Sequence, residues 1–245
     1  DTLPASLLGA ALSVADKIDT VVGYFSIGLV PSGSADPYAL RRQAAGAVSV
    51  HAEWRFALGL DSLVARAARL FGSAGEAEDE ARQAQIVEDV MSFIQARLKA
   101  SLEESGHRHD IADAVLAAGC GRPACVFERA HAVAQVVDEA WFAALATAAS
   151  RVRNIAMNAG ADLFSPALFQ DEAERELFDA AKALEEEVRA SIEARMSGFV
   201  DRTAYVSALE RTSVISPAID RYFEKVMVMV DDEAVRNNRL AMLKW

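Results

Sequence analysis

The sequence predicts an all-α protein. Apolar residues recur at the i, i+3 and i+4 spacing of a buried helix face along most of the 245 residues. No segment combines the alternation and the short turn that mark a β-hairpin. The chain is 52% hydrophobic and 25% charged and has only two cysteines. This is the composition of a globular protein whose core needs no disulfide.

The first helix is predicted over residues 7–22, where apolar residues share one face. Within it, Asp16 and Asp19 lie about one turn apart. They can form an ion pair with Arg41 or Arg42, or one of them can be the last metal-binding aspartate of an HD-type helical bundle. We favour the ion pair, because the sequence lacks the other ligands of such a bundle.

The next two helices are predicted from their ends. Residues 31–37 form a turn cluster, in which Asp36 and Pro37 have the character of an N-cap followed by proline at the first helical position. The second helix should therefore begin there. Asp61 is expected to cap a third helix, which Gly72 closes.

The middle of the chain predicts one long helix and one short helix. Residues 73–82 are small and acidic, and should be a solvated connection or the start of a helix. Apolar residues then recur every four positions over 86–102, which predicts a long amphipathic helix ending near Gly106. Asp110 is expected to cap the short helix, and residues 119–124 (GCGRPA) to form a loop.

The remaining helices are predicted over residues 126–138, 139–158, 177–192 and 206–209, and in a last stretch that begins at Ser216 and Pro217. The run VMVMV at 226–230 has the composition of a strand. It continues the helical pattern of Ile219 and Tyr222, however, and has no strand partner elsewhere. We therefore predict that it is helical.

The cysteine and histidine residues do not form a recognisable metal site. Cys120 and Cys125 lie close together, but zinc needs four ligands, and only dispersed histidines could supply the rest. The sequence HRHD at 107–110 contains the His-Asp pair of HD phosphohydrolases. Asp110 is better explained as a helix cap and His109 as a surface loop residue. We expect free thiols, no metal and no catalytic residue.

The net charge of −11 makes a broadly basic nucleic-acid-binding protein impossible. Any nucleic acid must be held by a local patch. The sequence has no Walker A loop, no G-x-G-x-x-G and no nucleophile elbow, so no motif for ATP is present. No apolar run is long enough to span a membrane. These features favour a cytoplasmic protein with a specific partner.

Three pairs of arginines could contact such a partner: Arg41–Arg42, Arg151–Arg153 and Arg236–Arg239. Arg236 and Arg239 lie one turn apart on a predicted helix and flank Asn237 and Asn238. Such a helix can bind phosphates or stack on unpaired bases. The alternative is an ordinary surface with ion pairs.

Four ordered blocks of this sequence resemble the β subunit of bacterial tetrameric glycyl-tRNA synthetase. The first is LPASLLGAALSVADKIDTVVGYFSIGLVPSGSADPYALRRQAAG at 3–46. The others are DVMSFIQARLKASLEESG at 89–106, RVRNIAMNAG at 151–160 and FEKVMVMVDDEAVRNNRLAMLKW at 223–245. Together they span nearly the whole chain.

The resemblance implies a fold and an assembly. It implies the C-terminal part of an HD-like helical region with connecting helices at 1–118, followed by a helical anticodon-binding-like domain at 119–245. It also implies a C-terminal fragment that is trimmed at both ends. The family is an α2β2 enzyme in which the α subunit binds glycine, ATP and Mg²⁺, and the β subunit binds tRNA(Gly). The fragment itself is expected to bind no cofactor and to be inactive alone.

The family's hallmark R-V-x-N-I and V-D-D-x-x-x-R-x-N-R-L elements imply the site residues. The side chains that we expect to contact tRNA are Arg151, Arg153, Asn154, Arg236 and Arg239. The alternative is that these arginines pair with the acidic helix at 171–195. Two other functions stay open: a helical scaffold that contacts only the α subunit, and a degenerate HD-type phosphohydrolase.

Overall fold

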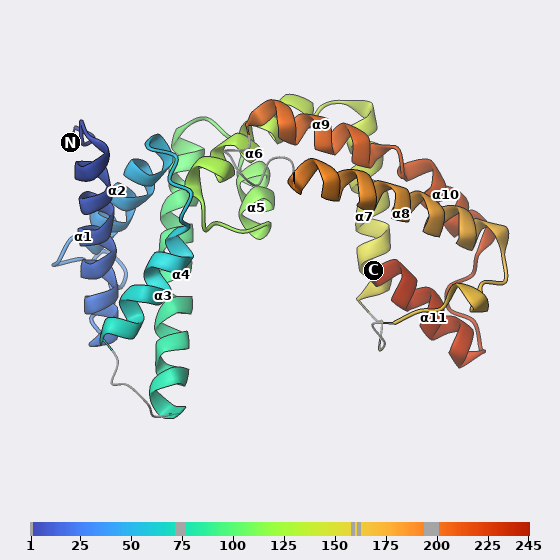
Figure 1. The fold of residues 1–245 in the computed structure, drawn as a ribbon, viewed down its shortest axis with the longest axis horizontal. Helices are drawn as coiled ribbons and strands as arrows, with labels where there is room; N and C mark the ends of the chain where they lie inside the picture. The colour runs from blue at the N-terminus through green and yellow to red at the C-terminus, as the bar shows by residue number, and fades with distance from the viewer. Residues whose placement is uncertain (1, 72–76, 158–159, 161–162, 194–200) are drawn as a thin grey trace. The chain divides into compact units, whose positions relative to one another are not determined.

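The computed structural model describes residues 2–71, 77–157, 160, 163–193 and 201–245. In these residues every named element is helical, from α1 to α11 with the short 3-10 helix η1 (Figure 1), and only an isolated bridge joins Ser32 to Ala35. The predicted all-α class is confirmed. None of the described helices combines the length and the apolar character needed to cross a bilayer.

Two compact units make up the chain. The first contains residues 1–134 and 198–202, and the second contains residues 135–197 and 203–245. The division falls within α6, whereas the sequence placed the boundary after residue 118, in the loop before that helix. The assignment of folding domains stays a prediction, and limited proteolysis can test it.

The first unit contains six helices around a core of small and β-branched residues. They are α1 (Leu7–Ser26), α2 (Leu40–Glu53), α3 (Leu60–Phe71), α4 (Ala77–Glu104), α5 (His109–Ala117) and α6 (Pro123–Val136). Helix α1 packs against α2, α3 and α4, and α5 packs against α4. The face of α4 predicted from the four-residue repeat is the buried one, since Val90, Ile94 and Leu98 are fully buried. The predicted helix end at Gly72 lies outside the described residues.

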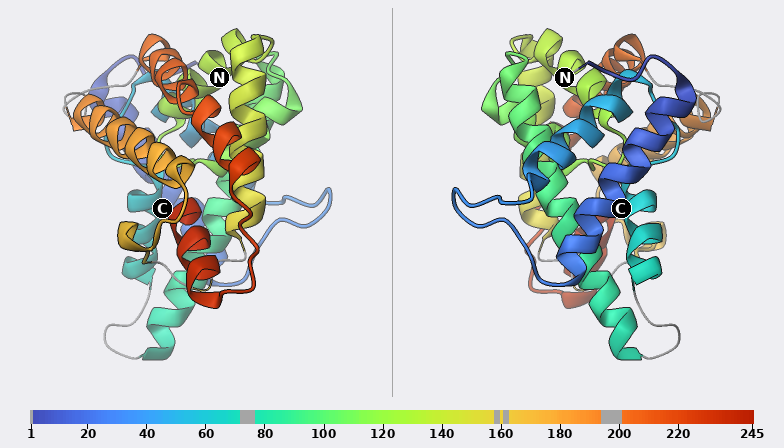
Figure 2. Two further views of the ribbon diagram at one scale, coloured as in Figure 1. Left: turned by 90° about the vertical axis from the view of Figure 1, so that its right-hand side faces the viewer. Right: turned by 90° about the vertical axis from the view of Figure 1, so that its left-hand side faces the viewer.

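The loop between α1 and α2 corrects one predicted helix start. Helix α2 begins at Leu40, three residues after Pro37. Asp36 still serves the helix: its two carboxylate oxygens accept hydrogen bonds from the backbone N–H groups of Leu40 and Arg41 at 2.8 and 3.0 Å. A left-handed residue, Ala39 with φ of 54°, separates the aspartate from the helix. The loop itself projects away from the helices (Figure 2).

The predicted ion pair of the first helix is wrong. Asp16 and Asp19 are exposed on α1. Within the described residues, neither forms an ion pair with Arg41 or Arg42. The Arg41 guanidinium instead donates to the carbonyl of Gly33 at 2.7 Å, which braces the projecting loop.

The start of α5 is also corrected. The N-cap is Arg108, and His109 is the first helical residue. His109 contacts the carboxylates of Glu103 at 2.9 Å and Asp113 at 3.1 Å, so it belongs to a surface charge cluster. The two cysteines are free thiols, and burial raises the pKa of the Cys120 thiol. In the part of the chain that is described, no three His, Cys, Asp or Glu side chains are grouped as a metal site would require.

The second unit contains the remaining helices. They are α7 (Ala140–Ala156), η1 (Pro166–Leu168), α8 (Glu172–Glu193), α9 (Arg202–Ser213), α10 (Ser216–Lys225) and α11 (Glu233–Lys244). Helix α10 packs against α7 and α8, and α11 packs against α7. Leu177, Ile219, Tyr222, Leu240 and Leu243 form part of its core.

The prediction that residues 226–230 are helical is wrong. Helix α10 ends at Lys225, and the next residues form an irregular connection to α11. Val226 and Val228 are buried, while Met227 and Met229 are 73% and 61% exposed. This alternation has the period of two of an extended backbone rather than the helical period that we assumed. We call residues 226–230 the α10–α11 connection.

Candidate nucleic-acid interface

Three of the five predicted contact residues lie exposed on α7. Arg151, Arg153 and Asn154 are all exposed, whereas Leu145 and Ala148 of this helix are buried and Val152 packs against the core of the second unit. Successive residues of an α-helix are about 100° apart, so side chains two positions apart leave opposite sides. Arg151 and Asn154 therefore share one side of α7, and Arg153 lies on another.

Arg151 rests on an aromatic ring. Its guanidinium carbon lies 4.2 Å from the ring centroid of Phe223 on α10. A cation at this distance over a ring face is attracted by the negative face of the ring. The contact fixes where the otherwise flexible side chain of Arg151 lies.

Arg153 borders an apolar hollow of ≈ 580 Å³. The hollow is lined by α7, the middle of α8 at Leu184, the α9–α10 junction and the end of α11, and Met157 and Lys244 lie at it as well. Arg153 and Lys244 place two cationic side chains on this hollow.

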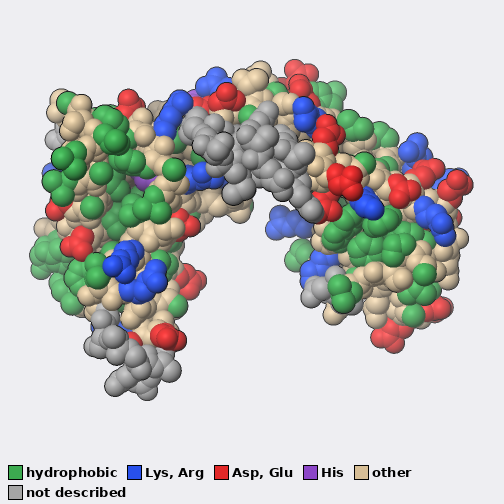
Figure 3. Space-filling model, viewed as in Figure 1, with side chains coloured by type: hydrophobic (Ala, Val, Ile, Leu, Met, Phe, Trp, Pro, Cys, Tyr) green, Lys and Arg blue, Asp and Glu red, His purple; other side chains and the backbone are tan. Residues whose placement is uncertain are grey.

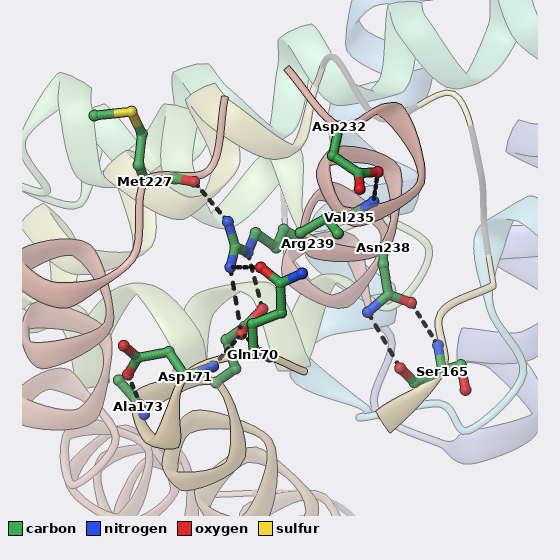
Figure 4. Close-up of polar contacts among 10 residues, drawn as sticks. Ser165, Gln170, Asp171, Ala173, Met227, Asp232, Val235, Asn238 and Arg239 are labelled. Carbon is green, nitrogen blue, oxygen red and sulfur yellow. Dashed lines mark hydrogen bonds and ion pairs between the residues drawn. The ribbon is translucent and has the colours of Figure 1, made fainter. Parts of the chain in front are cut away.

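Arg239 is not on the surface, contrary to the prediction. Only 6% of the residue is exposed. Its Nε donates to Oε1 of Glu174 at 2.9 Å, and its Nη1 donates to the carbonyl oxygen of Met227 at 2.9 Å. Figure 4 shows the guanidinium held between the start of α8 and the α10–α11 connection. Arg239 therefore pairs with the acidic helix α8, which was the alternative to tRNA contact.

Glu174 is the residue that the sequence analysis missed. It is fully buried, and besides Arg239 it binds the backbone N–H groups of Gln170 and Asp171, which donate to its Oε2 at 2.7 and 2.8 Å. Burial acts to raise the pKa of this carboxyl. The hydrogen bonds from Arg239 and from the two N–H groups outweigh it, so the pKa of Glu174 is lowered. The carboxylate thus stays ionised inside the core.

Tyr222 lies beside this pair. Its hydroxyl is buried and makes no hydrogen bond to any described residue. Burial raises the pKa of the phenol, and the nearby negative charge of Glu174 raises it further. The ring therefore acts as a neutral core residue.

Asn238 is a second internal clamp of α11. Its Oδ1 accepts from the backbone N–H of Ser165 at 2.7 Å, and its Nδ2 donates to the carbonyl of the same residue at 3.2 Å. Asp232 caps the helix by accepting from the N–H groups of Ala234 and Val235. Much of the V-D-D-x-x-x-R-x-N-R-L element therefore stabilises the fold.

Arg236 is intermediate in burial between the exposed arginines of α7 and the buried Arg239. It is half-buried, and its Nη1 donates to the carbonyl oxygen of Val230 at 2.9 Å. Arg236 and Arg239 thus each hold one carbonyl of the α10–α11 connection. The prediction that Arg239 contacts tRNA does not fit its burial against Glu174, whereas contact by Arg236 stays a prediction.

Two acidic residues on the outer face of α8 form ion pairs with other arginines. Arg221 lies 3.2 Å from Glu176 and Arg211 lies 3.5 Å from Glu187. In the space-filling view, acidic and basic side chains alternate over the visible face of this unit (Figure 3). Within the described residues, Arg151, Arg153 and Asn154 form no ion pair or hydrogen bond through their side chains. These three side chains of α7 therefore remain available to a ligand.

Two family models match the chain. Residues 1–117 match a model described as glycyl-tRNA synthetase beta subunit. Residues 145–245 match a model described as DALR anticodon binding domain. The second match begins within α7 and runs to the end of α11, and so includes every residue of the candidate interface.

Curated relatives match over essentially the whole chain. It is 40% identical over 244 residues to the glycine–tRNA ligase beta subunit of Desulforamulus reducens. It is 38% identical over 248 and 246 residues to the corresponding subunits of Halalkalibacterium halodurans and Moorella thermoacetica. In each case the aligned region is 34% of the relative, so the chain spans about a third of the length of the relatives that it matches.

Proposed function

Because the chain belongs to the glycyl-tRNA synthetase β-subunit family, we propose that it is the tRNA-binding part of a glycine–tRNA ligase β subunit. The observation that carries the proposal is the exposure of Arg151, Arg153 and Asn154 on α7, within the match to an anticodon-binding domain. The ligand is tRNA(Gly), contacted through its anticodon loop.

The chemistry of an anticodon suits this surface. Its bases are unpaired, so side chains can stack on them and reach their edges. A few arginine and amide groups on rigid helices are sufficient for such contacts, whereas duplex binding relies on many phosphate contacts. A chain with a net charge of −11 can therefore bind an RNA loop through one small patch.

The catalytic step is proposed to lie on another subunit. We assign glycine, ATP and Mg²⁺ to the α subunit of an α2β2 enzyme in the cytoplasm, and the positioning of tRNA to this chain. The chain has no phosphate-binding motif, and its described residues contain no acidic cluster suited to a divalent cation. Its role is to hold the RNA while the partner subunit activates and transfers glycine.

Direct binding tests the proposal. Fluorescence anisotropy should be measured with the chain, tRNA(Gly) and tRNAs that differ from it only in the anticodon, over a series of salt concentrations. We expect tRNA(Gly) to bind most tightly. The double variant Arg151→Gln/Arg153→Gln should weaken binding, and it should reduce the slope of log affinity against log salt by about one unit for each of the two charges that lies against a phosphate.

Arg221→Gln is the matched control, since Arg221 is an exposed arginine of the same unit that is already paired with Glu176. It should leave the affinity and the salt slope unchanged. Equal binding of all tRNAs by the chain, or no effect of the double variant, would contradict the proposed anticodon surface.

A second candidate function is docking to the α subunit. Helix α1 exposes Leu8 and Leu12 by 80% and 68%, and apolar side chains so exposed are typical of protein contacts. Leu8→Glu/Leu12→Glu should then weaken association of the two subunits, measured by sedimentation, while tRNA binding by the chain is retained. Loss of tRNA binding with intact association would exclude this role for α1.

A further inference from the structure

The contact between Arg151 and Phe223 joins an exposed guanidinium to an aromatic ring that the core holds in place. Phe223 is half-buried, packs against the core of the second unit and meets the ring of Tyr222 edge-on, with centroids 5.2 Å apart. Tyr222 is itself completely buried. The ring under the guanidinium is therefore anchored in the core, while Arg151 above it is exposed.

This arrangement presents a flat cation to solvent. A guanidinium group is planar, and it can stack on an aromatic ring with one face while its other face stays open. Arg151 makes no ion pair within the described part of the chain, so no carboxylate competes for that face. Nucleobases stack on arginine planes and on aromatic rings in complexes with unpaired RNA.

We propose that Arg151, supported by Phe223, is the stacking platform for one unpaired base of the RNA loop. The inference rests on the proposed tRNA-binding function and assigns a specific task within it. Asn154 lies one turn along the same side of α7 and is exposed. Its amide can both donate to and accept from the edge of a base that lies on the platform.

The platform differs physically from a phosphate contact. A phosphate contact depends on charge, and lysine can replace arginine in it at little cost to the salt dependence. A stacking contact depends on the flat guanidinium and on the ring beneath it, and lysine cannot provide it. The stacking contact and the phosphate contact are distinguished by removing either the planar guanidinium of Arg151 or the base that stacks on it.

The experiment combines protein variants with abasic RNA. The 245-residue chain is titrated with tRNA(Gly) transcripts that each carry one abasic nucleotide in the anticodon loop. At one position of the loop, the abasic nucleotide should weaken binding by the native chain about tenfold, the effect typical of a lost base stack. Arg151→Lys should weaken binding to intact tRNA by the same factor, and the abasic transcript should then cost nothing more. Its salt slope should equal that of the native chain.

Changes to the ring should follow the same pattern. Phe223→Leu should abolish the abasic penalty at that position, and Phe223→Tyr should retain it. Arg221→Lys, two residues from Phe223 on the same helix, should change neither the affinity nor the penalty. Thermal melting shows whether each variant is folded. If Phe223→Leu does not fold, Arg151→Lys still tests the inference, because Arg151 is exposed and its replacement should not affect folding.

Other results would overturn the inference. An abasic penalty that is unchanged in Arg151→Lys excludes stacking on this residue, and if Arg151→Gln also lowers the salt slope, Arg151 contacts a phosphate. In that case tRNA binding itself stands. If the native chain does not bind tRNA(Gly), both the proposed function and the platform are wrong.

Discussion

Helices α7 and α11 carry the same kinds of residue and use them in opposite ways. Each has two arginines and at least one asparagine within four positions. On α7 the three side chains are exposed, whereas on α11 Asn238 and Arg239 are buried and bind Ser165 and Glu174. Residue type and spacing therefore do not distinguish polar side chains exposed on the surface from polar side chains that hold the fold together.

The difference arises from which side of each helix faces the core. Arg239 lies four residues after Val235 and four before Leu243, so it falls on the buried stripe of α11. On α7 the stripe runs through Leu145, Ala148 and Val152, and Arg151 and Arg153 lie beside it. A buried arginine is stable only when a carboxylate and other acceptors surround it, and Glu174 provides that carboxylate.

The largest expected effect is the loss of the buried ion pair. Arg239→Ala leaves the carboxylate of Glu174 buried without its partner, and should lower the free energy of unfolding by about 3–5 kcal/mol. Urea denaturation followed by circular dichroism measures this. If Arg239 instead contacted tRNA, as predicted from the sequence, Arg239→Ala would keep its stability and lose affinity for tRNA.

The double variant Glu174→Leu/Arg239→Met removes both charges from the same place. It should recover much of the stability lost in Arg239→Ala, because no unpaired charge remains. A full loss in the double variant would mean that the hydrogen bonds to Met227 and to the α8 start matter more than the charge pair.

The next effect compares the two asparagines. Asn238→Ala leaves the N–H and carbonyl of Ser165 without the partner that the side chain supplies, and should cost about 1–3 kcal/mol of unfolding free energy. Asn154→Ala, on the exposed face of α7, should change stability by less than about 0.5 kcal/mol. Equal losses in both variants would remove the contrast between the helices.

Arg236 should fall between these cases. Arg236→Ala removes one hydrogen bond to Val230 from a half-buried side chain, so stability should fall by about 1 kcal/mol. The affinity for tRNA(Gly), measured on folded protein at low temperature, should stay within about twofold of the native value if the arginine only holds the connection. A fall in the salt slope of about one unit would instead show that it contacts a phosphate.

The smallest effect is a dependence of stability on acid. The pKa of Glu174 is lowered in the folded state from its ordinary value of 4.5. Its contribution to stability is therefore complete above that ordinary value and declines as the pH falls below it, because the folded state must then take up a proton it holds poorly. Between about pH 5 and pH 3, Glu174→Gln should lose less stability than the native chain. Identical acid profiles from thermal melting would mean that Glu174 is not the titrating group.

Sequence periodicity predicted the helices well, because each buries a continuous apolar face. The long helix over 86–102 lies within α4, and the helices predicted over 177–192 and 206–209 lie within α8 and α9. The single stretch predicted from Ser216 is instead two helices, α10 and α11. Helix starts were less predictable. Asp36 and Asp110 are residue types that cap helices, yet the N-cap residues of α2 and α5 are Ala39 and Arg108. The backbone conformation before each helix therefore sets where the helix begins.

The candidate site could be predicted only in part. The exposed residues of α7 were identified from their types, but the burial of Arg239 depends on Glu174, 65 positions earlier in the chain. One signal was present: Glu174 precedes Leu177 by three positions, and both Glu174 and Arg239 occupy apolar stripes of their helices. Two opposite charges on two such stripes indicate a buried pair. The stacking of Arg151 on Phe223 has no such signal, since α7 and α10 meet only in the folded chain.

The clamps of α11 also have a consequence for the order of events during synthesis. Ser165 and Glu174 leave the ribosome 73 and 65 residues before the side chains that bind them. At translation rates of ~5–20 residues per second, they wait roughly 3–15 s for these partners. During that interval the carboxylate of Glu174 must remain hydrated, so the start of α8 cannot enter an apolar core. The second unit therefore closes late, when α11 emerges, and the platform on α7 and α10 matures after most of the unit has been made.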